Sequence, residues 1–327
     1  MESPWERLVG LSSLKKAPDL MAAEGIRDPK RIGLELDVLP VNFFMRLKSL
    51  LPGAEFVDAS EAIRKVRMIK SPYEVAHMRQ AARHLEQGFE AIPEWMHAGV
   101  TELEISARLE ALLRMAGHQG LTRMRGFNYE ISFGTISIGP SACYPTCFPG
   151  PVGFQGLYAA IPGGAGKREL SHGDILMADF VGGYEGYIVD QTRVYSLGTP
   201  PPEMEQAHNF VVELMRGIES MLRPGTACEQ IWQFAVEKVA GTPYVEGFMG
   251  LGDSRVQFLG HGVGLELNEI PVLAKGQDTF LEPGMTVAIE PKIFFPGRGG
   301  VGLENTYLIT PSGFDNLTPF PEAMFRV

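Results

Sequence analysis

The sequence predicts an α+β fold in which one helix-and-strand unit occurs twice, preceded by a short α/β segment. Two capping boxes of the form Thr-x-x-Glu, beginning at Thr101 and Thr226, mark the starts of two amphipathic helices. Each of these helices follows a longer one that ends in a glycine-containing turn. Both helix pairs are followed by stretches rich in glycine, proline and β-forming residues. This recurrence indicates an internal pseudo-twofold duplication, which places a site between the two halves.

The chain is expected to form two domains, a short α/β segment at residues 1–66 and a larger domain at 67–327. Hydrophobic periodicity predicts that the first runs helix, strand, helix, strand, helix, with its strands at 31–36 and 54–57. The second is expected to open with a long helix, because a capping box begins at Ser71 and a proline follows it directly.

Composition and charge narrow the class of protein. With 45% apolar residues the chain can bury a large core, and its 39 acidic against 29 basic residues give a formal charge of -10. Lysine and arginine form no cluster suited to a phosphate backbone, so a nucleic-acid partner is not expected. The sequence shows no secretory signal, and no apolar run approaches the ~20 residues of a membrane span. Together with the three cysteines, these features favour a cytoplasmic protein.

Asp179 and Asp190 flank a glycine-rich turn between two apolar strands. The glycines at 182, 183 and 186 predict a β-hairpin in this segment. If its turn centres near Tyr184 and Glu185, the two aspartates lie directly opposite each other and their side chains meet on one face.

Glu290 and Glu304 repeat this arrangement further along the chain. Folding about Gly297 places the two glutamates opposite each other, and His261 lies between the two carboxylate pairs in sequence. Taken alone, each carboxylate is explained as a solvated strand residue, and a lone histidine as a hydrogen-bonded core residue. Four converging carboxylates, however, repel one another unless they are protonated or bind cations. The set therefore predicts a metal site.

From about residue 70 to 327 the sequence resembles the superfamily of Xaa-Pro peptidases, prolidases and creatinases, which has the pita-bread fold. The order Asp, Asp, His, Glu, Glu carries this resemblance, as does the Asp-x-Thr-Arg run that ends at Arg193. The resemblance implies a dinuclear centre of two divalent metal ions, bridged by the second aspartate and the last glutamate. Its implied ligands are Asp179, Asp190, His261, Glu290 and Glu304.

The resemblance also implies a mechanism and an assembly. Glu290 is expected to be catalytic, carrying a proton from the activated water to the leaving nitrogen. Oxygen ligands with one imidazole suit Mn, Co, Zn or Fe without selecting one of them. Family members are often dimers, so a homodimer is expected. Residues 1–66 are about half the usual length of the family's N-terminal domain, which indicates a shortened segment or one completed by a partner subunit.

The sequence departs from the family where relatives carry cationic side chains. Thr146 and Asn268 stand at positions of two histidines, and Gly302 stands at the position of an arginine. Threonine and asparagine form hydrogen bonds but offer no cationic donor. Because the loss of such a donor typically costs on the order of 10²-fold in rate, ordinary Xaa-Pro cleavage is not expected. Instead, Thr146, Asn268 and Tyr187 are expected to shape a pocket for a different small substrate.

Two functions from different classes remain open at this point. One is a metal-dependent hydrolase acting on the C–N bond of a dipeptide or small amide, or a related lyase or hydrolase of another small molecule. The other is an inactive binding or regulatory protein that keeps its metal for structure. The complete five-residue set favours the enzyme, because it preserves an arrangement suited to activating water.

Overall fold

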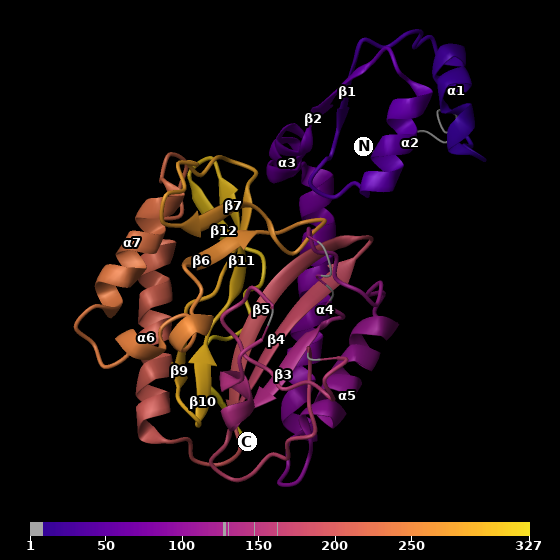
Figure 1. Ribbon diagram of the computed structural model, residues 1–327. Coiled ribbons are helices and arrows are strands. Elements are labelled where there is room, and N and C mark those ends of the chain that lie inside the picture. Colours follow the sequence, from indigo (N-terminus) through magenta and orange to yellow (C-terminus); the bar gives the residue numbers. More distant parts are fainter. Residues whose placement is uncertain (1–8, 127–128, 130, 147, 162) are drawn as a thin grey trace. The chain divides into compact units, whose positions relative to one another are not determined.

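The computed structural model describes residues 9–126, 129, 131–146, 148–161 and 163–327. These residues form two compact units, which divide the chain near Arg67 (Figure 1). Within the described residues, every helix is either too short or too polar to span a lipid bilayer.

The smaller unit alternates helix and strand, as the sequence predicts. In order, its helices and strands are α1 (Ala17–Ala23), β1 (Arg31–Leu34), α2 (Val41–Leu50), β2 (Glu55–Asp58) and α3 (Ser60–Met68). A short 3-10 turn at Leu14–Lys16 precedes α1. Strands β1 and β2 pair in parallel, with Ile32 opposite Phe56. The predicted order of helices and strands is confirmed.

The larger unit contains two helix pairs, each followed by strands that pair antiparallel except for β13, which pairs in parallel with β5. The first half consists of α4 (Pro72–Trp95), α5 (Glu102–Met115), β3 (Gly134–Ile138), β4 (Ile175–Tyr184) and β5 (Tyr187–Ser196). The second half begins with α6 (Pro202–Glu219) and α7 (Cys228–Val239). Its strands are β6 (Phe258–Gly262), β7 (Glu269–Ala274), β8 (Thr286–Ile289), β9 (Lys292–Phe295), β10 (Gly299–Gly302), β11 (Asn305–Thr310), β12 (Gly313–Asn316) and β13 (Phe325–Arg326). The predicted α+β class is confirmed.

Two sheets form the centre of the larger unit. One has the strand order β13-β5-β4-β3 and the other β12-β11-β8-β6-β7, while β9 and β10 form a separate hairpin. Helices α4 and α5 pack beside the first sheet, and α6 and α7 pack against the strands of the second half (Figure 1). An isolated bridge between Thr192 and Glu304 connects the two halves. The halves therefore meet where two of the predicted metal-binding segments lie.

Two of the three predicted capping boxes are present. Ser71 and Thr101 each accept a hydrogen bond from the N–H three residues on, and the glutamate at that position accepts one from the N–H of the cap. The capping box predicted at Thr226 is wrong. The Thr226 hydroxyl donates to the Met221 carbonyl at 2.7 Å, and α7 begins two residues later at Cys228. The Thr226 hydroxyl thus bonds to the backbone of the preceding turn and does not cap the start of the helix.

Candidate metal centre

The β4–β5 hairpin places Asp179 and Asp190 on one face, but not directly opposite each other. Asp179 pairs with Thr192, two residues beyond Asp190. The turn is formed by Glu185 and Gly186, whose φ angles of 49° and 85° are left-handed. The predicted turn centre is therefore wrong by one residue, because a type I′ hairpin turn requires left-handed backbone at both positions and these two residues supply it. The aspartates are diagonal neighbours, still within reach of one another.

The β9–β10 hairpin has the register predicted for Glu290 and Glu304. Lys292 pairs with Gly302, and a further backbone hydrogen bond of 3.2 Å extends the ladder toward the two glutamates. Continuing this register by two residues places Glu290 opposite Glu304. Gly297 lies in the turn with a left-handed φ of 67°. The predicted fold about Gly297 is confirmed.

His261 lies in β6, and the backbone fixes the orientation of its ring. Its Nδ1 is 3.1 Å from the carbonyl of Gly262, which can only accept, so Nδ1 carries the proton and Nε2 keeps its lone pair. Burial lowers the pKa of His261, although the nearby Glu304 carboxylate opposes that effect. Nε2 is 3.6 Å from Glu290 Oε1. A neutral imidazole with a free Nε2 is the form of histidine that binds metal ions.

Asp190, His261 and Glu304 converge on one point. One ligand atom from each lies within 4.8 Å of the other two. Asp190 Oδ1 and Glu304 Oε1 are buried and accept no hydrogen bond within the described part of the chain. Buried oxygens without partners destabilise a fold, and a bound cation removes that cost. The donors at this point therefore fit a divalent metal ion.

Lys292 is a further site residue, which the sequence motifs do not mark. Its Nζ donates to Asp179 Oδ2 at 3.1 Å, Glu290 Oε2 at 2.6 Å and Glu304 Oε2 at 2.9 Å. The lysine side chain is fully buried. The sequence contains one signal for the role of Lys292. Residues 290 and 292 project from the same side of an extended chain, so a lysine at 292 is placed beside Glu290.

Burial governs the charge of this cluster. It raises the pKa of Asp179 to about 6 and that of Glu290 to about 8, although Lys292 opposes both shifts. Burial, together with the Glu304 and Asp179 charges, also raises the pKa of Asp190 well above its ordinary value. For Lys292, burial acts downward, but the surrounding carboxylates raise its pKa well above the ordinary value. At neutral pH the lysine is thus cationic and part of the carboxyl set holds protons.

These shifts predict how the stability of the metal-free protein depends on pH. Because the folded Asp179 and Glu290 hold protons that the unfolded chain has lost, these two carboxyls lower the free energy of unfolding as pH rises from about 4 to about 8. Buried His118, whose pKa falls to about 4, acts in the opposite direction up to about pH 6.5, so the net fall is expected above that pH. Urea unfolding midpoints measured across this range in a chelator provide the test. Glu290→Gln should make the decline above about pH 6 shallower, because it removes a carboxyl whose pKa is raised to about 8, while the raised pKa of Asp190 keeps part of the decline. A metal-free protein that gains stability between about pH 6.5 and about pH 8 would contradict the prediction.

The three residues predicted to shape a substrate pocket each contact another group of the protein. Thr146 Oγ1 accepts a hydrogen bond from the N–H two residues on, at 2.8 Å. Asn268 bonds to both the N–H and the carbonyl of Arg125, at 2.7 and 2.8 Å. The Tyr187 ring stacks on His77 with 5.6 Å between centroids. These contacts orient the side chains, and their role toward a substrate stays a prediction.

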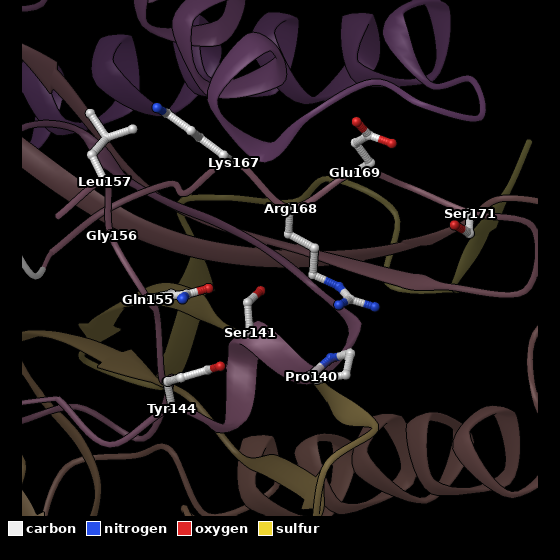
Figure 2. A pocket seen from close by; sticks show the side chains of 10 residues that line it. All are labelled: Pro140, Ser141, Tyr144, Gln155, Gly156, Leu157, Lys167, Arg168, Glu169 and Ser171. Carbon is white, nitrogen blue, oxygen red and sulfur yellow. The ribbon is translucent and has the colours of Figure 1, made fainter.

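A separate cavity of about 670 Å³ opens beside the 3-10 turn Gly139–Cys143. Figure 2 shows Arg168 extending across it toward Pro140, with Tyr144 and Gln155 on its other side. Its lining includes none of the carboxylates, the histidine or the lysine of the cluster. The cavity is therefore distinct from the candidate metal centre.

An α+β domain that gathers three buried carboxylates, a partly exposed fourth and a neutral histidine, with two ligand oxygens that accept no hydrogen bond from the described residues, belongs to the class of metal-dependent hydrolases. The chain is a member of metallopeptidase family M24, whose model matches residues 76–311. A second model, the creatinase/prolidase N-terminal domain, matches residues 1–69. Membership of a metallopeptidase family implies bound divalent metal. The predicted superfamily is confirmed.

Known proteins resemble the chain over most of its length. The Xaa-Pro dipeptidase of Pyrococcus horikoshii is 29% identical, over 96% of this chain and 79% of its own. The probable dipeptidase PepE of Mycobacterium tuberculosis is also 29% identical, over 89% of this chain and 69% of its own. The crystal structure of the X-Pro aminopeptidase from Thermotoga maritima superposes with a TM-score of 0.81 at 26% identity, covering 98% of this chain and 81% of that one. The predicted pita-bread fold is confirmed.

Proposed function

We propose that the chain is a metal-dependent peptidase that hydrolyses the C–N bond of a dipeptide or another small amide. The observation that carries the proposal is the convergence of Asp190, His261 and Glu304 with two buried oxygens that have no partner among the described residues. Relatives named as dipeptidases and an X-Pro aminopeptidase support this substrate class. In this proposal residues 67–327 form the catalytic domain and residues 1–66 its N-terminal companion.

The residues proposed to form the metal centre are those of the predicted set: Asp179, Asp190, His261, Glu290 and Glu304. Divalent ions bound there would lower the pKa of a coordinated water and polarise the attacked carbonyl. His261 offers a neutral Nε2, while Asp190 and Glu304 each offer one oxygen that accepts no hydrogen bond from the described residues. Two ions, the choice among Mn, Co, Zn and Fe, the homodimer and the cytoplasmic location stay predictions from the sequence.

Glu290 is proposed as the proton carrier. Burial raises its pKa to about 8, so that its carboxyl can hold and release a proton near neutral pH. The hydrogen bond from Lys292 fixes Oε2, and Oε1 is left facing His261 Nε2. The two oxygens of this carboxyl therefore differ in environment, and the proton is expected at Oε1.

Selectivity for proline is not part of the proposal. Thr146 and Asn268 hydrogen-bond to backbone groups, and neither can supply the cationic donor that the family resemblance leads us to expect. We propose that these two residues and Tyr187 bound a pocket that accepts small peptides without a requirement for proline.

The test is metal-dependent turnover of a dipeptide panel that includes substrates with and without proline. Removal of metal by a chelator is expected to lower kcat/KM by on the order of 10²-fold or more, because the charge stabilisation at the reacting carbonyl is lost. Adding back Mn, Co, Zn or Fe should restore turnover. Hydrolysis that persists unchanged in chelator would contradict the proposal. An ion-loaded protein that cleaves none of the panel would favour the binding-protein alternative.

A further inference from the structure

The oxygens of the cluster divide into two sets. Asp179 Oδ2, Glu290 Oε2 and Glu304 Oε2 all accept hydrogen bonds from one ammonium group, that of Lys292. Asp190 Oδ1 and Glu304 Oε1 accept none within the described residues. Glu304 thus contributes one oxygen to each set, and each set marks a position where a cation can bind. The first position is the one surrounded by Asp179 Oδ2, Glu290 Oε2 and Glu304 Oε2. The first position already holds a positive charge supplied by the chain.

The ammonium group of Lys292 makes the contacts with carboxylates that a bound cation would make at that position. An ammonium group has three donors, and each of its three acceptors here lies between 2.6 and 3.1 Å away. Its side chain has no exposed surface. A divalent ion that used Asp179 Oδ2 and Glu290 Oε2 would have to displace the ammonium and leave it buried without acceptors, which is strongly unfavourable.

The surrounding backbone is shaped to hold this lysine. Lys292 pairs across the hairpin with Gly302, and a Cβ at residue 302 would lie only 2.4 Å from Lys292 Cγ. The lysine stem therefore occupies the space that any other side chain at 302 would need. On its other side, the Lys292 carbonyl accepts a hydrogen bond from the N–H of Met249 at 2.9 Å. Both ends of the lysine are fixed, its backbone by two neighbours and its ammonium by three carboxylates.

We propose that the centre binds one divalent ion rather than two, with the ammonium of Lys292 as a permanent second cation. The ion takes the position bounded by Asp190, His261 and Glu304, while Asp179 serves as a partner of the lysine. This inference rests on the proposed metal-dependent function and replaces the expectation of a dinuclear centre with a hybrid of one metal ion and one lysine.

The experiment counts the ions bound to a chain of residues 1–327. Metal-free protein is dialysed against MnCl₂ at a free concentration about 100 times the Kd of the first ion, and bound manganese is measured by mass spectrometry. We expect one ion per wild-type chain and two in Lys292→Gly, which frees the position and returns three carboxylates. Lys275→Gly, at an exposed lysine in a turn, is the matched control and should bind one.

Electron paramagnetic resonance gives a second readout that needs no variant. Wild-type protein loaded with Mn²⁺ should give the spectrum of an isolated ion, whereas an exchange-coupled pair would overturn the inference even if Lys292→Gly does not fold. Two ions in the wild type, or one in a folded Lys292→Gly, would also overturn it and leave the metal-dependent function standing. A wild-type chain that binds no ion would overturn the proposed function as well.

Discussion

Asp190→Asn is expected to abolish metal binding and reduce peptide turnover to background. The substitution keeps the shape of the side chain but removes the anionic charge of Oδ1, one of the two carboxylate oxygens in the cluster that accept no hydrogen bond from the described residues. Even groups that only orient metal ligands contribute about 10- to 100-fold to metal affinity, so the loss of a charged ligand should weaken Mn²⁺ binding at least about 100-fold. Isothermal titration with Mn²⁺ and kcat/KM on a dipeptide measure the two effects.

The metal-free form of Asp190→Asn separates the role of a ligand from a structural role. Burial and the neighbouring carboxylates raise the pKa of Asp190, so a neutral amide should leave the metal-free fold as stable as the wild type or more so. Asp253→Asn makes the same change on an exposed carboxylate and should alter neither binding nor stability. An Asp190→Asn protein that binds Mn²⁺ normally, or that unfolds without metal, would contradict the assigned role.

Arg193→Met should produce the largest loss of stability, about 3–5 kcal/mol. The guanidinium has no exposed surface and donates to the carbonyls of Thr192 and Glu304 at 2.8 Å and to Asn305 Oδ1 at 2.7 Å. Methionine fills much of the space of the stem but leaves these buried acceptors without donors. Because two of these acceptors belong to the bridge between the halves, the loss should appear in the free energy of unfolding without metal.

Urea unfolding monitored by circular dichroism, in the presence of a chelator, measures the effect. Arg108→Met, on the exposed face of α5, is the matched control and should change stability by no more than about 0.5 kcal/mol. If Arg193→Met unfolds at the same urea concentration as the control, the guanidinium does not hold the two halves together.

The register of the two hairpins shows what local sequence can determine. Gly297 lies where a turn between Glu290 and Glu304 is needed, and the predicted pairing about it is correct. The first hairpin offers glycines at 182, 183 and 186, so several turn centres are compatible with the pattern, and the predicted one is off by one residue. The prediction that Asp179 and Asp190 lie on one face of the hairpin is still correct, because the two residues are diagonal neighbours.

The place of Lys292 could not be read from local pattern alone. Strand alternation puts it on the same side as Glu290, but its other partners come from β4 and from the connection between β10 and β11. A lysine two residues from a glutamate can point to solvent or into a carboxylate cluster. Which of the two occurs depends on how these distant segments pack together in the tertiary structure. Thr226 illustrates the same limit, since its capping pattern is intact but its hydroxyl has a nearer acceptor in the preceding turn.

A lysine among the carboxylates also bears on how the protein matures. Small metal-dependent domains remain unfolded until their ion arrives, because nothing else balances their ligands. Here the ammonium of Lys292 supplies one positive charge to Asp179, Glu290 and Glu304 from within the chain. We therefore expect that a newly synthesised copy folds this domain in a metal-poor environment and binds metal afterwards. Under the proposed metal-dependent function, metal supply would then limit activity without limiting the amount of folded protein.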